Sequence, residues 1–106
     1  TEYAQALLNI LYNARDVLRE RQVAEPLIRI TIRKAEKGSL LSIRDNGGGI
    51  PGQILHRIFE PYVTTKGPGQ GTGIGLYMAK TMIERNMGGR LTAHNVEHGA
   101  EFRIIL

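Results

Sequence analysis

Two glycine-rich segments constrain this chain more than any other feature. Residues 45–50 read Asp-Asn-Gly-Gly-Gly-Ile, and residues 71–76 read Gly-Thr-Gly-Ile-Gly-Leu at the start of an amphipathic helical pattern. Glycine lets the backbone approach a ligand closely and adopt positive φ angles, and N–H groups at a helix start attract anions such as phosphate. Either motif alone arises by chance. Together, in this order, they predict one nucleotide-binding site.

A helix predicted over residues 2–22 places polar groups upstream of both segments. Its apolar residues repeat at helical spacing on one face: Leu7, Leu11, Ala14 and Leu18. Asn9, Asn13 and Asp16 fall on roughly the opposite face, at about 100° per residue. By itself this polar row is typical of a solvated helix face. Followed by the two glycine segments, it indicates a face against which a Mg²⁺–phosphate group docks, because Mg²⁺ prefers oxygen ligands.

A hairpin is predicted before the first glycine segment. Strands over residues 27–34 and 40–44 are joined by a turn at 36–39, and the second strand ends at Asp45. The isoleucines of the first strand alternate with polar residues and should share a half-buried face: Ile28, Ile30 and Ile32.

Asp45 itself has two interpretations. An Asp-Asn-Gly sequence is a frequent turn opening, and as a lone observation the turn is the better interpretation. Three successive glycines followed by Ile50 and Pro51 are more than a turn needs, and they favour close approach of a ligand. A carboxylate at this place can accept a hydrogen bond from an adenine amino group.

The second half of the chain completes an α/β pattern. A short helix is predicted over 52–59, a loop rich in glycine and proline over 60–71, a helix over 72–86, and strands over 90–96 and 101–106. The later helix should bury one stripe: Leu76, Ala79, Met82 and Ile83. It should end at Gly88-Gly89. Phe59 and Tyr62 are candidate anchors of the loop, and Lys66 is its only lysine.

Composition excludes several classes of function. The chain has 106 residues, 42% of them hydrophobic, enough for one small domain, and it has no cysteine for disulfides or thiol chemistry. The net charge of +4 could suggest nucleic acid. The basic residues are scattered along the sequence without an aromatic platform, so no nucleic-acid partner is expected. The histidines lack metal-ligand spacing, and Gly71 to Gly75 is not followed by the Lys-Ser/Thr of a Walker A motif.

Taken together, the motifs resemble the Bergerat-fold superfamily of gyrase, a heat-shock chaperone, the mismatch-repair ATPase and histidine kinases. The likeness is strongest to the catalytic, ATP-binding domain of a two-component sensor histidine kinase. The matching segments are the N box at 7–16, the glycine boxes at 45–50 and 71–76, the F box at 58–66, and a weaker match at 88–91 and 99–102. The resemblance implies an α/β two-layer sandwich, with a mixed, mostly antiparallel sheet and helices on one face. Residues 1–106 would be one domain of a longer protein, whose preceding strand and dimerisation domain lie upstream.

The resemblance also implies a site for ATP and Mg²⁺. Its residues would be Asn9, Asn13, Asp16, Asp45, Gly47, Gly49, Ile50, Phe59, Thr65, Lys66, Gly71, Thr72, Gly73, Ile74, Gly75 and Leu76. Asp45 would recognise adenine and Asn13 would hold Mg²⁺. Asn9 and Lys66 would help to place the phosphates for transfer. Glu101 stands where a small hydroxyl residue is frequent in the family, a departure that could alter the water network beside the adenine.

The implied activity is transfer of the γ-phosphoryl group to a histidine on the dimerisation domain of a homodimeric kinase that serves a response regulator. The domain would be cytoplasmic, within a full-length protein that could be membrane-anchored. Hydrolysing members of the superfamily carry a glutamate base where this chain has Asn9, which argues against a gyrase-like or chaperone-like ATPase. An anti-sigma-type serine kinase, a nucleotide-binding pseudo-kinase and a small non-enzymatic interaction module remain as alternatives.

Overall fold

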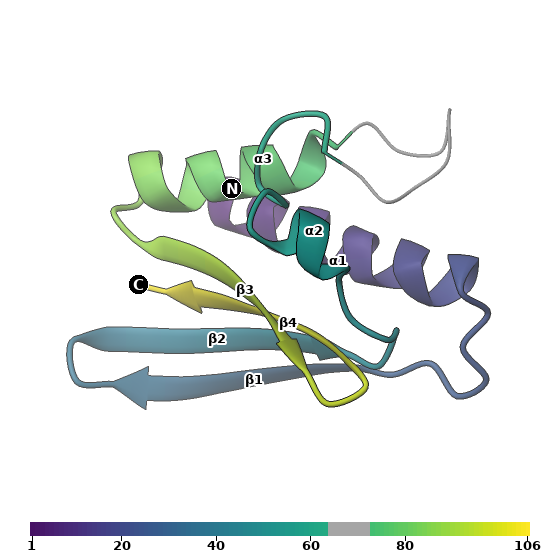
Figure 1. Ribbon diagram of the computed structural model, residues 1–106. Helices are drawn as coiled ribbons and strands as arrows, with labels where there is room; N and C mark the ends of the chain where they lie inside the picture. The colour runs from purple at the N-terminus through teal and green to yellow at the C-terminus, as the bar shows by residue number, and fades with distance from the viewer. Residues whose placement is uncertain (64–72) are drawn as a thin grey trace.

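The computed structural model describes residues 1–63 and 73–106, which form two layers, helices over a sheet (Figure 1). The elements in chain order are α1 Glu2–Glu20, β1 Ile28–Ala35, β2 Gly38–Asp45, α2 Gly52–Leu55, α3 Gly75–Thr81, a π-helical turn η1 Met82–Asn86, β3 Arg90–Val96 and β4 Gly99–Ile105. None of the helices in these residues is long and apolar enough to span a membrane.

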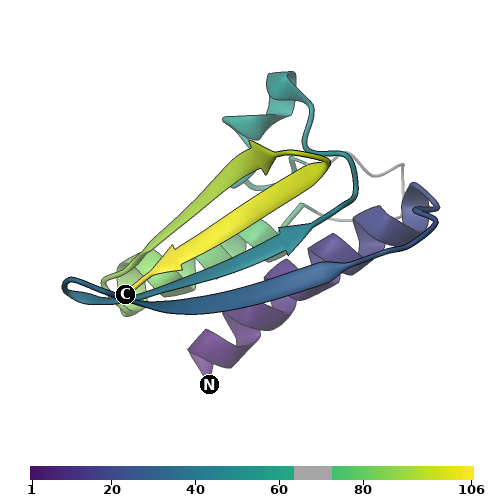
Figure 2. The same cartoon turned by 90° about the horizontal axis from the view of Figure 1, so that it is seen from below.

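The four strands form one sheet in the order β1-β2-β4-β3, and all three neighbouring pairs are antiparallel. Two-residue turns close the hairpins, at residues 36–37 between β1 and β2 and at 97–98 between β3 and β4. The described helices lie on one side of the sheet, whereas its other side is open (Figures 1 and 2). The two-layer α/β prediction is therefore confirmed.

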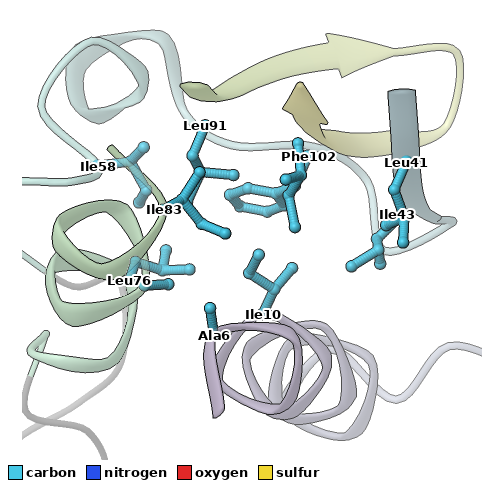
Figure 3. Close-up of a cluster of buried hydrophobic side chains, with 11 residues drawn as sticks. Ala6, Ile10, Leu41, Ile43, Ile58, Leu76, Ile83, Leu91 and Phe102 are labelled. Atoms are coloured by element: carbon cyan, nitrogen blue, oxygen red, sulfur yellow. The ribbon is translucent and has the colours of Figure 1, made fainter. Parts of the chain in front are cut away.

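The core fills the space between the two layers (Figure 3). Phe102 and Ile43 from the sheet meet Ile10 of α1 and Ile83 of η1, and each of these side chains is almost completely buried. The buried face of α1 is rotated from the predicted one, since its buried residues are Ala6, Ile10, Ala14 and Leu18. The predicted Leu7 and Leu11 are only partly buried and pack at the edge of the cluster. The helix turns this way because it contacts α3 as well as the sheet.

The prediction of a half-buried β1 is wrong. Ile30 and Ile32 are 51% and 69% exposed, although their partners Ile43 and Leu41 on β2 are buried. β1 is the edge strand of the described sheet, and the helices cover β2 and the strands beyond it. Alternation identifies residues that share a face, but it does not reveal whether that face is covered.

The second long helix begins later than predicted. α3 starts at Gly75 and passes into η1 at Met82. The predicted glycine end is confirmed, because Gly88 has a φ of +68° and the Gly89 N–H donates to the Ile83 carbonyl at 2.9 Å. The helix predicted over 52–59 is also shorter in the structure, where α2 ends at Leu55. After Leu55 the chain continues in tight turns, in which N–H groups donate to carbonyls three residues earlier.

Candidate functional site

Asp45 occupies the buried end of β2 and is only 6% exposed. Its Oδ1 accepts the Gly47 N–H at 2.9 Å and the Ala100 N–H at 3.4 Å. Its Oδ2 accepts no hydrogen bond in the part of the chain that the structure describes, and it is not fully buried. Backbone groups thus orient the carboxylate through one oxygen and leave the other for a ligand donor.

The first glycine segment is held from two sides. On one side, Arg21 at the end of α1 donates through Nη1 to the carbonyls of Gly47 and Gly49, at 2.5 and 2.8 Å. On the other, the Asn95 amide of β3 accepts the Ile50 N–H at 2.7 Å and donates to the Ile50 carbonyl at 2.8 Å. The segment needs glycine, since Gly49 has a φ of +90° and a Cβ there would lie 3.0 Å from Asn95 Oδ1. These contacts fix the backbone beside Asp45.

A small cavity of about 30 Å³ opens between α1, the glycine segment and β4. Its walls include Asn13 and Val17 of α1, Asp45, Ala100 and Ile58. It has room for about two water molecules, so a purine base needs the lining side chains to separate. The predicted Gly49 and Ile50 also line it, together with Arg21. The fold therefore brings the N box, the first glycine box and the last strand to one place.

The α1 residues follow one line along the helix. Asn9, Asn13, Val17 and Arg21 are spaced four residues apart. The row extends about 18 Å along α1 and ends at Arg21, the residue that follows the helix. Asn9 Nδ2 donates to the Gly75 carbonyl at 3.2 Å, and its Oδ1 accepts from Gln5 Nε2 at 2.9 Å. Asn13 is half-buried, and its amide makes no hydrogen bond to any described residue. Asn13 is the group of this row with free ligand capacity.

Gly73 and Gly75 lie at the start of α3. Gly73 has a φ of +71° and packs so closely on Tyr62 that a Cβ would lie 2.6 Å from the Tyr62 carbonyl carbon. The Tyr62 N–H donates to the Gly73 carbonyl at 3.1 Å. The Tyr62 side chain is 76% exposed, so it does not pack as an anchor and only its backbone joins the two segments.

Other predicted site residues lie outside the cavity. Phe59 and Phe102 pack in a T-shaped arrangement with ring centroids 6.0 Å apart, and Lys80 Nζ lies over the Phe59 ring, 4.7 Å from its centroid. Leu76 is a core residue, and Ile74, two residues earlier, is half-buried just before α3. Asp16 forms an ion pair with Arg15 at 3.1 Å. Four further predicted residues lie outside the described residues: Thr65, Lys66, Gly71 and Thr72.

Glu101 does not border the cavity, so the expected influence on an adenine-side water network is wrong. In the β2–β4 register Glu101 pairs with Arg44, so its side chain points away from the helices, and Ala100 points inward to Asp45. Glu101 Oε2 accepts from Arg44 at 2.9 Å and Oε1 from Arg103 at 2.5 Å. Burial raises the pKa of Glu101, but the hydrogen bonds and charges of Arg103 and Arg44 outweigh burial and leave the pKa below its ordinary value.

Arg21 and Asn95 are site residues that sequence reasoning missed. Both act on backbone groups far along the chain, so no local motif contains them. An asparagine inside a strand is unusual, and for Asn95 this was the available signal. No cluster of three acidic, histidine or cysteine side chains suited to a metal occurs within residues 1–63 and 73–106. A metal here needs ligands from the nucleotide, as Mg²⁺ commonly takes them from phosphates.

The match to one family of known proteins extends over the whole chain. The family described as histidine kinase-, DNA gyrase B-, and HSP90-like ATPases matches residues 1–106. The chain is 45% identical over 105 residues to the two-component sensor PprA of Pseudomonas aeruginosa, covering 96% of this chain and 11% of that protein. It is 38% identical over 103 residues to the signal transduction histidine-protein kinase AtoS of Escherichia coli, covering 96% of this chain and 16% of that protein. The chain thus spans a small part of the curated relatives it matches.

Solved structures agree with this grouping. The mycobacterial sensor histidine kinase MprB superimposes with a TM-score of 0.78 at 27% identity, covering 96% of this chain and 67% of that one. Full-length ShkA in complex with AMPPNP superimposes with a TM-score of 0.69 at 26% identity, covering 94% of this chain and 21% of that one.

Proposed function

The chain belongs to the family of histidine kinase-, DNA gyrase B-, and HSP90-like ATPases, and from this premise we propose that it binds ATP with Mg²⁺ and transfers the γ-phosphoryl group to a histidine on a separate dimerisation domain. The observation that carries the proposal is the carboxylate of Asp45. Backbone N–H groups hold its Oδ1, while Oδ2 has no partner in the described chain. That oxygen can accept the amino group of adenine, directly or through water.

The residues present suit the metal and phosphates. Asn13 would offer an oxygen ligand to Mg²⁺, which supplies charge neutralisation of the phosphate groups. Asn9 ties α1 to the start of α3 through the Gly75 carbonyl, so the two helix segments that flank the phosphates keep a fixed spacing. Backbone N–H groups at Gly73 and Gly75 would contact phosphate oxygens, and Lys66 would add positive charge. Phosphoryl transfer depends mainly on such positioning and electrostatics.

Asn9 favours transfer to a protein group over hydrolysis. A water-activating base must accept a proton near neutral pH, and an amide cannot. The Asn9 amide is moreover occupied by Gly75 and Gln5. The relatives' names support the same direction, since PprA is a two-component sensor and AtoS a histidine-protein kinase. The acceptor histidine, a homodimer and a response regulator would then belong to the longer protein.

Labelled ATP tests the proposal in two steps. The chain alone should bind ATP in a calorimetric titration and release phosphate only slowly, because general-base assistance is worth roughly a hundred- to ten-thousand-fold in rate. Addition of a dimerisation domain with an acceptor histidine should then produce a labelled, acid-labile product. Rapid phosphate release by the chain alone would instead support a gyrase-like ATPase. Label on His56, His94 or His98 would place the acceptor inside this chain and contradict the proposal.

A further inference from the structure

The arginines that are scattered along the sequence gather on the helix-free face of the sheet. Strand alternation and the pairing register place Arg29 and Arg33 of β1, Arg44 of β2, Arg103 of β4 and Arg90 of β3 on the side opposite to the buried Leu41, Ile43 and Phe102. Figure 2 views the sheet from this side, with the strands in front of the helices. We call these five residues the arginine face.

One acidic side chain from the strands shares this face. Glu101 pairs with both Arg44 and Arg103. The face therefore carries a surplus of four positive charges, which equals the net charge of the whole chain. The three remaining arginines are exposed and have no ion pair with any described residue: Arg29, Arg33 and Arg90.

The arrangement leaves the charges of Arg29, Arg33 and Arg90 without a partner in the described chain. Arg29 also lies directly opposite Arg44 in the β1–β2 register. Like charges in opposed positions destabilise a sheet, and Glu101 offsets the charge of Arg44 only in part because it also pairs with Arg103. Between the arginines lie the hydroxyl groups of Thr31 and Ser42, which are also opposite each other. The guanidinium groups spread across four strands, about 14 Å at the usual strand spacing. A single small anion cannot contact them all, whereas a surface bearing many phosphate groups can.

Apolar side chains in the same face decide which polyanion fits. Leu40 pairs with Ile105, which is 37% exposed, and this pair lies between Arg33 and Arg90 in one row across the sheet. Arginine beside exposed aliphatic groups suits the boundary between lipid phosphates and acyl chains. None of the outward residues of the four strands is Phe, Tyr or Trp. The outward His94 ring is half-buried and lies 2.9 Å from the Thr92 hydroxyl, so the face lacks the large exposed stacking groups that single-stranded nucleic acid uses.

We propose that the arginine face binds the surface of a bilayer containing anionic phospholipids. Arg29, Arg33 and Arg90 contact lipid phosphates, and Leu40 with Ile105 meets the boundary below them. The candidate nucleotide residues lie on the opposite side of the sheet, since Asp45 and Ala100 face the helices. Membrane contact therefore leaves the nucleotide site open, and it does not depend on whether that site acts as a kinase.

Vesicle co-sedimentation tests the proposal without nucleotide. Phosphatidylcholine vesicles with increasing phosphatidylglycerol content should bind the chain increasingly well, and added salt should release it. The double variant Arg29→Gln/Arg33→Gln should weaken binding by about fivefold per arginine removed. The matched control is Arg19→Gln/Arg85→Gln, which changes the net charge equally at exposed arginines of α1 and η1. The control should bind nearly as well as the parent, and circular dichroism should show all forms folded.

Three results would overturn the proposal. Absence of binding to phosphatidylglycerol vesicles at low salt would remove its basis. Equal weakening in both double variants would mean that net charge acts without a specific face. Tighter binding to an RNA homopolymer than to the vesicles at the same salt would assign the face to nucleic acid instead.

Discussion

The two ends of the candidate nucleotide site are built differently. At the base end, the glycine segment 45–50 is held by Arg21 and Asn95, and the Gly48 N–H donates to the His98 carbonyl at 2.9 Å. At the phosphate end, the described contacts include one hydrogen bond from Asn9 to Gly75 and the backbone contact of Tyr62 with Gly73. The base end is thus preorganised by side chains from distant elements. The described part of the phosphate end is joined to α1 through Asn9 and to the Tyr62 backbone, so variants of the two ends should differ in which part of a nucleotide they affect.

The largest effect should come from Asp45→Asn. The amide keeps an oxygen for the Gly47 N–H, so the fold should survive, but the free position becomes an amino donor that faces the adenine amino group. A lost hydrogen bond to a charged group corresponds to roughly ten- to hundredfold in affinity. Calorimetric titration with ATP and AMP should show the same loss for both nucleotides. The control is Glu101→Gln, which alters the other buried carboxylate. Parent-like affinity in a folded Asp45→Asn protein would contradict the assignment of adenine binding to Asp45.

Arg21→Ala should have the next largest effect. It removes both hydrogen bonds from α1 to the glycine segment and frees Gly47 and Gly49 to move. We expect about a tenfold weaker affinity for both ATP and AMP, near the net worth of one or two hydrogen bonds. Added guanidinium ions should restore part of the affinity, which a general loss of folding would not allow. Arg19→Ala provides the control. A loss confined to ATP would place the action of Arg21 on the phosphates and reverse the comparison.

Asn13→Ala should affect binding at the phosphate end of the site and leave the base end unchanged. If Asn13 is a Mg²⁺ ligand, affinity for ATP with Mg²⁺ should fall about fivefold, in line with one lost polar contact. Affinity for metal-free ADP should change much less. Asn95→Ala, which loosens Ile50 at the base end, should weaken both forms equally. Calorimetric titrations with ATP in Mg²⁺ and with ADP in chelator measure the two affinities. If Asn13→Ala lowers both affinities equally, Asn13 is not a metal ligand.

The smallest effect concerns Glu101 and should spare the site altogether. Its pKa is lowered in the folded chain, so its contribution to stability is present at neutral pH and is lost as the pH falls below the ordinary value of 4.5 toward the folded pKa. Glu101→Gln should cost no more than about 1 kcal/mol at neutral pH, because its arginine partners are half-exposed. Its unfolding free energy should depend less on pH in the acid range than that of the parent. Nucleotide affinity should not change, and a marked change would put Glu101 back beside the base.

The sequence predicted the two layers and the meeting of Asn13, Asp45 and the glycine segment, because motif order and hydrophobic period are local properties. It could not predict Arg21, whose partners are backbone carbonyls 26 and 28 residues away. Glu101 was misplaced because a shift of one residue in a strand moves a side chain to the opposite face. The exposure of Ile32 depends on how far the helices extend over the sheet, which no strand pattern records.

The length of the β3–β4 turn determines which residues of β4 face the candidate site. Two residues, Glu97 and His98, separate the strands, and this length places Ala100 against Asp45. An insertion of one residue that β4 absorbed by sliding would exchange inward and outward positions and set the Glu101 carboxylate beside that of Asp45. Every motif residue would still be present, yet the base end would hold two like charges. A homologue of this chain is therefore better compared by the length of that turn than by its glycine boxes alone, and loop grafts at this hairpin should preserve the two-residue length.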